Sequence, residues 1–300
     1  MTTSDQTDPV NATKPEFSRR GFVALGAGAA LVAGSAAAAN AQTEFGKPHA
    51  PIVAEDDSMI VVSRPHLTPS AGGPILAYAA TPRIVTARTP GVVVIQHIWG
   101  VDATIRDTVR RYAKNGYIAI APELFGRLSA PSGDGLTDYQ PFAAVAGKMF
   151  AQGFVTTDAL AAHDWIRTQA RDASIGITGF CMGGGIALQQ IIDSKAYAAC
   201  SMFYGSVRPG TKSDDPTTAA TFDFTSRITT PLMGSFGARD TSIKPDDVRA
   251  MFARLTAPHD VKIYDEAGHA FFDDTRSSYV PSAAADAWTR TLAWFKTYLT

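Results

Sequence analysis

Short apolar runs of two kinds alternate along the chain. The run GVVVIQHI, from Gly91 to Ile98, is continuous and β-branched, which is typical of a strand buried on both faces. The next segment, Asp102 to Gly116, has its apolar residues at helical spacing, an aspartate at its start and a glycine at its end. Because this alternation continues to the C-terminus, it predicts crossover units and a mostly parallel sheet covered by helices on both faces.

The same pattern predicts the individual elements. Strands are expected at Ile75–Pro82, Gly91–Ile98, Tyr117–Leu124, Ile175–Phe180, Ala196–Gly205, Thr230–Gly237 and Val261–Ala267. Helices are expected at Asp102–Gly116, Thr156–Ala170, Gly183–Ser194, Pro245–Ala257 and Ser282–Leu299. A segment rich in Gly, Pro, Ser and Asp, from Arg127 to about Pro141, is expected to be a loop. Ligands bind at the carboxyl ends of the strands in such sheets, so the residues after each strand are the candidates for chemistry.

Three of these strand ends carry reactive side chains. Cys181 follows the strand Ile175–Phe180 within GFCMGG, Asp240 lies in GARD, and His269 lies in EAGHAFF after the last strand. Nucleophile, acid and histidine then stand in the chain order of an α/β-hydrolase triad. The sequence therefore predicts an α/β-hydrolase fold in which these three side chains meet.

Each residue type suits a role in nucleophilic catalysis. Cys181 would stand at a sharp strand-to-helix turn, where the positive end of a helix favours the thiolate. His269 would exchange a proton with the sulfur and the leaving group, and Asp240 would hold the imidazole. The backbone N–H of Met182 would be one oxyanion donor, and that of Ile98, after the strand GVVVIQ, the second.

Taken one at a time, these motifs also have ordinary structural interpretations. A G-x-C-x-G turn also surrounds buried structural cysteines, and an Asp in GARD or a His in AGHAF also serves in loops. Their order and their common place at strand ends favour the triad. Cys200 lies in the middle of an apolar strand and His163 within a helix, so both are predicted to be structural. No His, Cys and carboxylate cluster has metal-ligand spacing, so no metal is expected.

The N-terminus has the pattern of an export signal. Arg19 and Arg20 precede a Gly- and Ala-rich apolar run, and Ala39 and Ala41 form an A-x-A cleavage site. The paired arginines indicate the twin-arginine export machinery as a partner and a periplasmic location. Residues 1–41 would be removed, residues 42–57 would be an irregular lead-in, and residues 58–300 would form the hydrolase domain. An uncut membrane anchor is the alternative interpretation.

The charge and hydropathy of the chain exclude some classes of binding partner. The 300 residues are 45% hydrophobic and 18% charged, with a net charge of −1, so there is no basic excess to bind nucleic acid. No later apolar run is long enough to cross a bilayer, so no stable membrane association is expected after processing. In an oxidising compartment the two cysteines, Cys181 and Cys200, could form a disulfide or stay as two free thiols, and the sequence is compatible with both.

The chain resembles the dienelactone hydrolase family. The stretches that carry the resemblance are VVVIQHIWGVDATIRDTVRRYAKNGYIAIAPELFGR, GITGFCMGGGIAL, GSFGARD, EAGHAFF and SSYVPSAAADAWTRTLAWF. This resemblance implies one α/β-hydrolase domain and a Cys181–His269–Asp240 triad with oxyanion donors at Ile98 and Met182. It also implies hydrolysis of an ester or lactone through an acyl-thioester, as in a carboxymethylenebutenolidase, without a cofactor.

Two departures from the family pattern bear on the substrate. The family's QEIFG pattern has a glutamate that contacts the cysteine and helps to gate its ionisation, and His97 stands at that position here. Of the two arginines that hold a substrate carboxylate, Arg127 matches one, whereas the other falls near Asp273. The opposite charge of Asp273 predicts a substrate other than the anionic dienelactone, such as a neutral ester or lactone.

Several alternatives stay open at this level. His97 either keeps Cys181 ionised or turns away to bond a backbone group. Trp99, Tyr204 and Phe271 either line the pocket or pack in the core. A general carboxylesterase or thioesterase on the same triad is the second function, and a non-catalytic binding or thiol redox-sensing protein on the same fold is the third.

Overall fold

One large sheet organises the molecule. The computed structural model describes residues 49–300, except residues 129, 131–132 and 209–218. Within this part of the chain nine strands pair in the order β1-β3-β5-β4-β6-β7-β8-β9, and β2 pairs with β3. Their bounds are β1 Ile60–Ser63, β2 His66–Leu67, β3 Ile75–Pro82, β4 Gly91–Ile95, β5 Ile118–Pro122, β6 Ile175–Phe180, β7 Ala199–Phe203, β8 Leu232–Gly237 and β9 His259–Tyr264.

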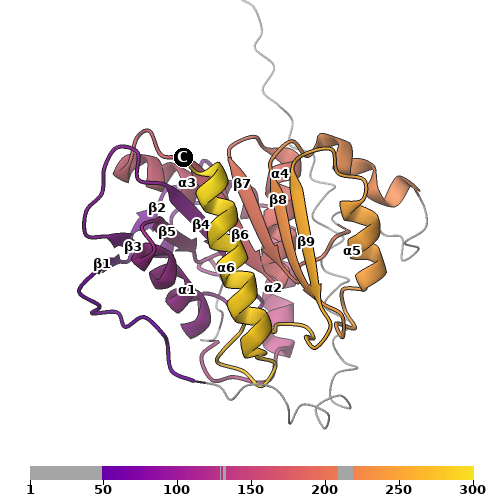
Figure 1. The fold of residues 1–300 in the computed structure, drawn as a ribbon. Helices are drawn as coiled ribbons and strands as arrows, with labels where there is room; N and C mark the ends of the chain where they lie inside the picture. The colour runs from indigo at the N-terminus through magenta and orange to yellow at the C-terminus, as the bar shows by residue number, and fades with distance from the viewer. Residues whose placement is uncertain (1–48, 129, 131–132, 209–218) are drawn as a thin grey trace, which may run out of the picture.

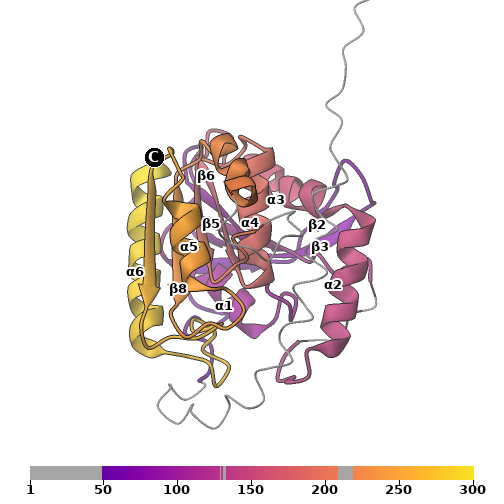
Figure 2. The ribbon, with the colours of Figure 1, turned by 90° about the vertical axis from the view of Figure 1, so that its right-hand side faces the viewer.

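The sheet is parallel from β5 through β9 and antiparallel where β3 meets β1, β2 and β5. Helices cover both faces, with α1 and α6 on one side and α3 and α4 on the other (Figures 1 and 2). The helices are α1 Ala103–Lys114, α2 Gln140–Gln152, α3 Val155–Gln169, α4 Met182–Asp193, α5 Pro245–Phe252 and α6 Pro281–Tyr298, with a 3₁₀ segment at Ala219–Arg227. The predicted α/β-hydrolase-like architecture is confirmed.

Two apolar cores lie on the two faces because strand side chains alternate in direction. Val93 and Ile95 of β4 pack into the core under α3 and α4, whereas Val92 and Val94 pack under α1 and α6. All five residues of β4 are buried, which explains the continuous apolar run in the sequence. The central strands thus present their carboxyl ends, rather than their faces, to ligands.

The structure contains elements that the sequence pattern did not predict. Helix α2 begins at Gln140, at the end of the segment expected to be a loop, and buries Phe142 and Met149 on one face. Pro141 lies in the first turn, where proline is tolerated, but Gly147 in the middle weakens the intrinsic helical signal, so the helix depends on the burial of that face. Strand β9 ends at Tyr264 rather than Ala267, because the Ala267 amide turns back to donate to the Tyr264 carbonyl at 3.2 Å.

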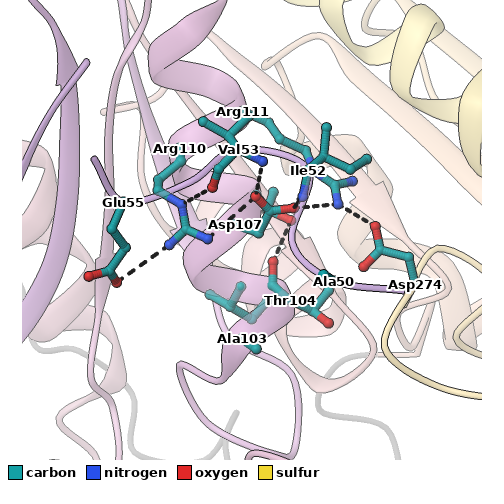
Figure 3. A network of polar contacts seen from close by, with 12 residues as sticks. Ala50, Ile52, Val53, Glu55, Ala103, Thr104, Asp107, Arg110, Arg111 and Asp274 are labelled. Carbon is teal, nitrogen blue, oxygen red and sulfur yellow. Dashed lines mark hydrogen bonds and ion pairs between the residues drawn. The ribbon is translucent and has the colours of Figure 1, made fainter. Parts of the chain in front are cut away.

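The predicted signal at residues 1–41 lies outside the described residues. Residues 49–57 contain no helix or strand, and their backbone is anchored on α1 (Figure 3). The Ile52 and Val53 amides donate to the Asp107 carboxylate at 3.0 and 2.9 Å. In the part of the chain that the structure describes, no helix combines the length and hydropathy that a transmembrane span requires.

Candidate active site

Cys181 lies at a sharp turn between β6 and α4. Its backbone has φ +53° and ψ −118°, a conformation that non-glycine residues rarely adopt. A Cβ on Gly179 would lie 2.1 Å from the Gly183 carbonyl oxygen, and one on Gly183 would lie 2.4 Å from the Gln96 carbonyl oxygen. Backbone therefore packs directly on backbone around Cys181, which is why glycines flank the cysteine.

The structure brings together the three residues that the sequence singled out. His269 Nε2 lies 3.0 Å from Cys181 Sγ, and His269 Nδ1 lies 2.7 Å from Asp240 Oδ2. Asp240 follows β8 and His269 follows β9, and these two strands are parallel neighbours. The other oxygen of Asp240 accepts from the Ser242 and Ile243 amides at 2.8 and 3.0 Å, so the carboxylate is fixed on both sides.

Electrostatics at this site favour a thiolate beside an imidazolium. Burial alone would raise the pKa of the Cys181 thiol, but the charges of His269 and His97 outweigh it and hold the pKa below its ordinary value. Burial alone would lower the pKa of His269, but Cys181 and Asp240 raise it well above the usual histidine range. The sulfur can therefore act as a nucleophile without first losing a proton to solvent.

The two amides expected to bind an oxyanion belong to Met182, which directly follows Cys181, and to Ile98, which follows β4, the strand that pairs with β6. Met182 is the first residue of α4, so its N–H has no acceptor within the helix, and it helps to hold the pKa of Cys181 down. Ile98 lies in the turn that the Gly100 amide closes by donating to the His97 carbonyl at 3.2 Å. Among the backbone hydrogen bonds of turns, loops and helix ends in the described residues, neither the Ile98 N–H nor the Met182 N–H is a donor. Both remain able to receive negative charge on a substrate oxygen.

His97 is bonded to carboxylates and not to a backbone group. Its Nε2 lies 2.8 Å from Asp102 Oδ1, and its Nδ1 lies 3.7 Å from Asp273 Oδ2. Burial would lower the pKa of His97, but Asp102, Asp273 and the nearby Cys181 raise it above its ordinary value. Of the two expectations for His97, the one in which its ring bonds a backbone group is therefore wrong.

The environment of Asp273 differs from the expectation. The sequence suggested a charge facing the substrate, but Asp273 is 1% exposed and its carboxylate is fully engaged. It accepts from the Thr104 hydroxyl at 2.6 Å, the Thr275 hydroxyl at 2.7 Å and Arg276 Nε at 3.0 Å. Pairing with Arg276 neutralises it, so Asp273 does not present a free charge to a ligand.

Sequence reasoning missed two members of this buried network. The sequence pattern indicates Asp102 only as the start of a helix, and it gives no signal for Arg276 in DDTRSS. Ligand-type atoms of His97, Asp102 and Asp273 lie within 4.8 Å of one another, although the spacing of these residues in the sequence does not indicate a metal site. Since Arg276 lies 3.0 Å from Asp273 and 3.6 Å from Asp102, the cluster is already an ion-pair network.

Arg127 is held by protein groups. Its guanidinium forms a two-pronged pair with Asp158 of α3, with N–O distances of 2.6 and 2.8 Å, and it also donates to the Gly72 and Gly73 carbonyls. Asp158 is 1% exposed, so the pair is largely buried. A substrate carboxylate would have to displace Asp158 before it could bind Arg127.

The aromatic residues divide between the site and the core. Trp99 follows Ile98, and the Arg276 guanidinium lies over its ring, 3.9 Å from the ring centroid. The Tyr204 ring lies 5.3 Å from the His269 ring and 5.3 Å from Phe271, in edge-on geometry. Phe271 is fully buried, so it is a core residue that supports Tyr204.

The remaining cysteine and histidines have structural settings. Cys181 and Cys200 are both free, so the disulfide that the sequence left open is not formed. Cys200 is buried in the middle of β7, and burial raises the pKa of its thiol. His163 pairs with Asp164 at 3.0 Å and packs edge-on against Tyr197.

Comparisons with known proteins show what the chain is similar to. A protein of Salmonella typhimurium named "Putative carboxymethylenebutenolidase" is 34% identical over 237 residues, which cover 77% of this chain and 85% of that protein. One of the same name from Escherichia coli K12 is 33% identical over 254 residues, covering 82% of this chain and 91% of that protein. The crystal structure of a "Putative Dienelactone Hydrolase" from Klebsiella pneumoniae matches with a TM-score of 0.70 and 32% identity, over 80% of this chain and 99% of that one.

The family model covers most of the chain. The description "Dienelactone hydrolase family" matches residues 75–299, from the first residue of β3 to the residue after the end of α6. The match includes β6, β8 and β9, whose ends carry Cys181, Asp240 and His269. Sequence, fold and relatives therefore agree, and the chain belongs to the dienelactone hydrolase family.

Proposed function

We propose that this protein hydrolyses carboxylic ester or lactone bonds with Cys181 as nucleophile, His269 as acid and base, and Asp240 as the group that orients His269. The observation that carries this proposal is the chain of two short contacts, 3.0 Å from Cys181 Sγ to His269 Nε2 and 2.7 Å from His269 Nδ1 to Asp240 Oδ2. The names of the relatives, carboxymethylenebutenolidase and dienelactone hydrolase, support the same reaction class.

The reaction would proceed in two halves. The Cys181 thiolate attacks the carbonyl carbon, and the Ile98 and Met182 amides receive the charge on the oxygen. The carbon–oxygen bond then breaks, and His269 gives its proton to the leaving alkoxide, which leaves an acyl-thioester on Cys181. In the second half, His269 takes a proton from water as that water attacks the thioester. The acid leaves, and the thiolate is restored with His269 protonated.

We propose that the substrate is an uncharged ester or lactone. The cation expected to hold a carboxylate, Arg127, is paired with Asp158 at 2.6 Å, and Arg276 is paired with Asp273 at 3.0 Å. An anion would therefore have to break a buried pair to gain a partner, and it would also meet the negative Cys181 and Asp240. A charged hydrogen bond contributes about 1.5–3 kcal/mol, so this preference is large enough to measure.

A panel of substrates tests both proposals with the purified protein. The panel contains dienelactone, its neutral methyl ester, p-nitrophenyl acetate and butyrate, and a simple thioester, and intact-mass spectrometry after rapid quenching detects an acyl group on Cys181. We expect an adduct on Cys181 and a kcat/KM for the methyl ester about tenfold or more above that for dienelactone. Faster hydrolysis of dienelactone would contradict the neutral substrate.

Other results on this panel would select the alternatives. Preference for the butyrate or the thioester would favour a general carboxylesterase or thioesterase on the same triad. Reversible oxidation of Cys181, with neither turnover nor an adduct, would favour the binding or redox-sensing protein.

We also propose that the protein is exported by the twin-arginine pathway. The support is the pair Arg19 and Arg20 before an apolar run and the A-x-A site ending at Ala41. Replacing both arginines by lysine is expected to retain the protein in the cytoplasmic fraction, with its N-terminal residues intact. An unchanged distribution between the cytoplasmic and periplasmic fractions would argue for another route.

A further inference from the structure

Four ionisable side chains form a largely buried cluster, here called the His97 cluster: His97, Asp102, Asp273 and Arg276. His97 is 5% exposed, Asp102 3% and Asp273 1%, so water reaches these three groups very little. The Cys181–His269–Asp240 mechanism does not use any of these four groups. Their charges must therefore be explained by what they do to one another and to their neighbours.

Both carboxylates of the cluster are held in place as acceptors. Asp102 caps α1, where it accepts from the Ile105 amide at 3.3 Å as well as facing His97. The hydroxyls of Thr104 and Thr275 and the guanidinium of Arg276 donate to Asp273, and they lower the pKa of that carboxyl together with His97, against the opposing effect of burial. Each aspartate thus has fixed partners that stabilise its charged form.

The net charge of the other three side chains in the cluster favours one protonation state of His97. Two carboxylates and one guanidinium carry a net charge of −1, and a buried unpaired charge is costly. Protonation of His97 brings the cluster to zero, and both ring nitrogens already face carboxylate oxygens, at 2.8 Å from Asp102 and 3.7 Å from Asp273. The arrangement is therefore built for an imidazolium at this position.

The same imidazolium stands next to the nucleophile. A Cβ on Gly183 would lie 2.4–2.5 Å from the Gln96 and Ile95 carbonyl oxygens, so the end of β4 packs directly on the start of α4. Ile95 of β4 also pairs with Gly179 of β6, so His97 and Cys181, each two residues further on, follow neighbouring strands at the same edge of the sheet. The electrostatic influence between the two groups is mutual. The other ionisable groups whose charges act on Cys181 or His97 are His269, Asp102 and Asp273. Arg276 contacts the two aspartates, and the charge of Cys181 acts on the Tyr204 phenol.

We infer that His97 is a positioning residue that acts as a fixed cation: held protonated by Asp102 and Asp273, it maintains Cys181 as a thiolate in addition to the effect of His269. The inference rests on the proposed role of Cys181 as nucleophile. His97 would not touch the substrate or move a proton during turnover. Its effect would be to keep the resting sulfur ionised at lower pH than His269 alone could.

The test is the pH dependence of Cys181 alkylation by iodoacetamide in the full-length protein, followed by mass spectrometry of the Cys181 peptide. Only the thiolate reacts, so the rate falls as pH drops through the pKa of the thiol. Replacing His97 by glutamine removes a cation, which raises that pKa, so the midpoint should move to higher pH by about one unit. The conservative variant His97→Lys restores a cation and should bring the midpoint back toward that of the wild type.

The matched control is His163→Gln, the same substitution at another buried histidine that pairs with an aspartate, on α3. Its midpoint should equal that of the wild type. A folded His97→Gln protein with an unshifted midpoint would overturn the inference, as would an equal shift in His163→Gln.

A second measurement covers the case in which His97→Gln does not fold. The ¹⁵N chemical shifts of the His97 ring in the wild-type protein should be those of an imidazolium at pH 7, and those of a neutral tautomer would overturn the inference. None of these measurements depends on turnover. A protein that failed the substrate panel could still show the shift, and one that passed it could lack the shift, so failure of the two proposals can be told apart.

Discussion

Replacing Cys181 by alanine is expected to reduce kcat/KM for the preferred ester at least about 10⁴-fold. The variant keeps the oxyanion amides of Ile98 and Met182, so some catalysis above the background rate should remain. It loses covalent attack altogether, and His269 loses the thiolate that helps to keep it protonated. The measurement is steady-state hydrolysis near pH 7, with circular dichroism to show that the variant is folded.

The chain supplies its own control for this prediction, because it has one other cysteine. Cys200 is buried in β7 and has no contact with His269 among the described side-chain contacts. The substitution Cys200→Ala should leave kcat/KM within about twofold and lower the free energy of unfolding by about 1 kcal/mol. If Cys181→Ala kept more than a tenth of the activity, Cys181 would not be the nucleophile.

Replacing Asp107 by alanine is expected to lower the free energy of unfolding by about 3–5 kcal/mol. Asp107 is 1% exposed, and its carboxylate accepts from the Ile52 and Val53 amides and from Arg111 Nε at 2.7 Å (Figure 3). Removing it leaves two backbone amides without their acceptor and takes a counter-charge from the buried guanidinium of Arg110, 3.4 Å away. Urea unfolding followed by tryptophan fluorescence measures the loss.

The matched control for Asp107 lies on α5. Asp246 pairs with Arg249 three residues on, as Asp107 pairs with Arg110, but the Asp246 side chain is 92% exposed. Because water screens this pair, Asp246→Ala should change stability by no more than about 0.5 kcal/mol. Equal effects of the two substitutions would show that the Asp107 network contributes little to stability.

The Asp107 network also reaches toward the active site. Arg111 bonds both Asp107 and Asp274, and Asp274 directly follows Asp273 of the His97 cluster. The His49 amide donates to the Asp274 carbonyl at 3.0 Å. The segment before β1 is therefore joined, through α1, to the loop that carries His269, so loss of Asp107 should loosen this loop as well as the N-terminal segment.

The sequence by itself determined the order of the strands from β3 to β9 and of every helix except α2, and the place of the three reactive side chains. Buried parallel strands leave continuous apolar runs, and helices leave a different period, so both could be located from a single chain. The glycines around Cys181 marked the turn because only glycine allows such close backbone packing, and Asp240 and His269 could be found because each follows a strand.

Only the tertiary structure decided which charges meet. Nothing local in the sequence shows that Asp102 and Asp273, 171 positions apart, approach the same imidazole, or that Asp158 takes the guanidinium of Arg127. A sequence pattern records whether a position is apolar and which face it occupies. The partner of a buried charge is selected by the packing of distant elements, because a charge removed from water is stable only beside an opposite charge that the whole fold brings to it.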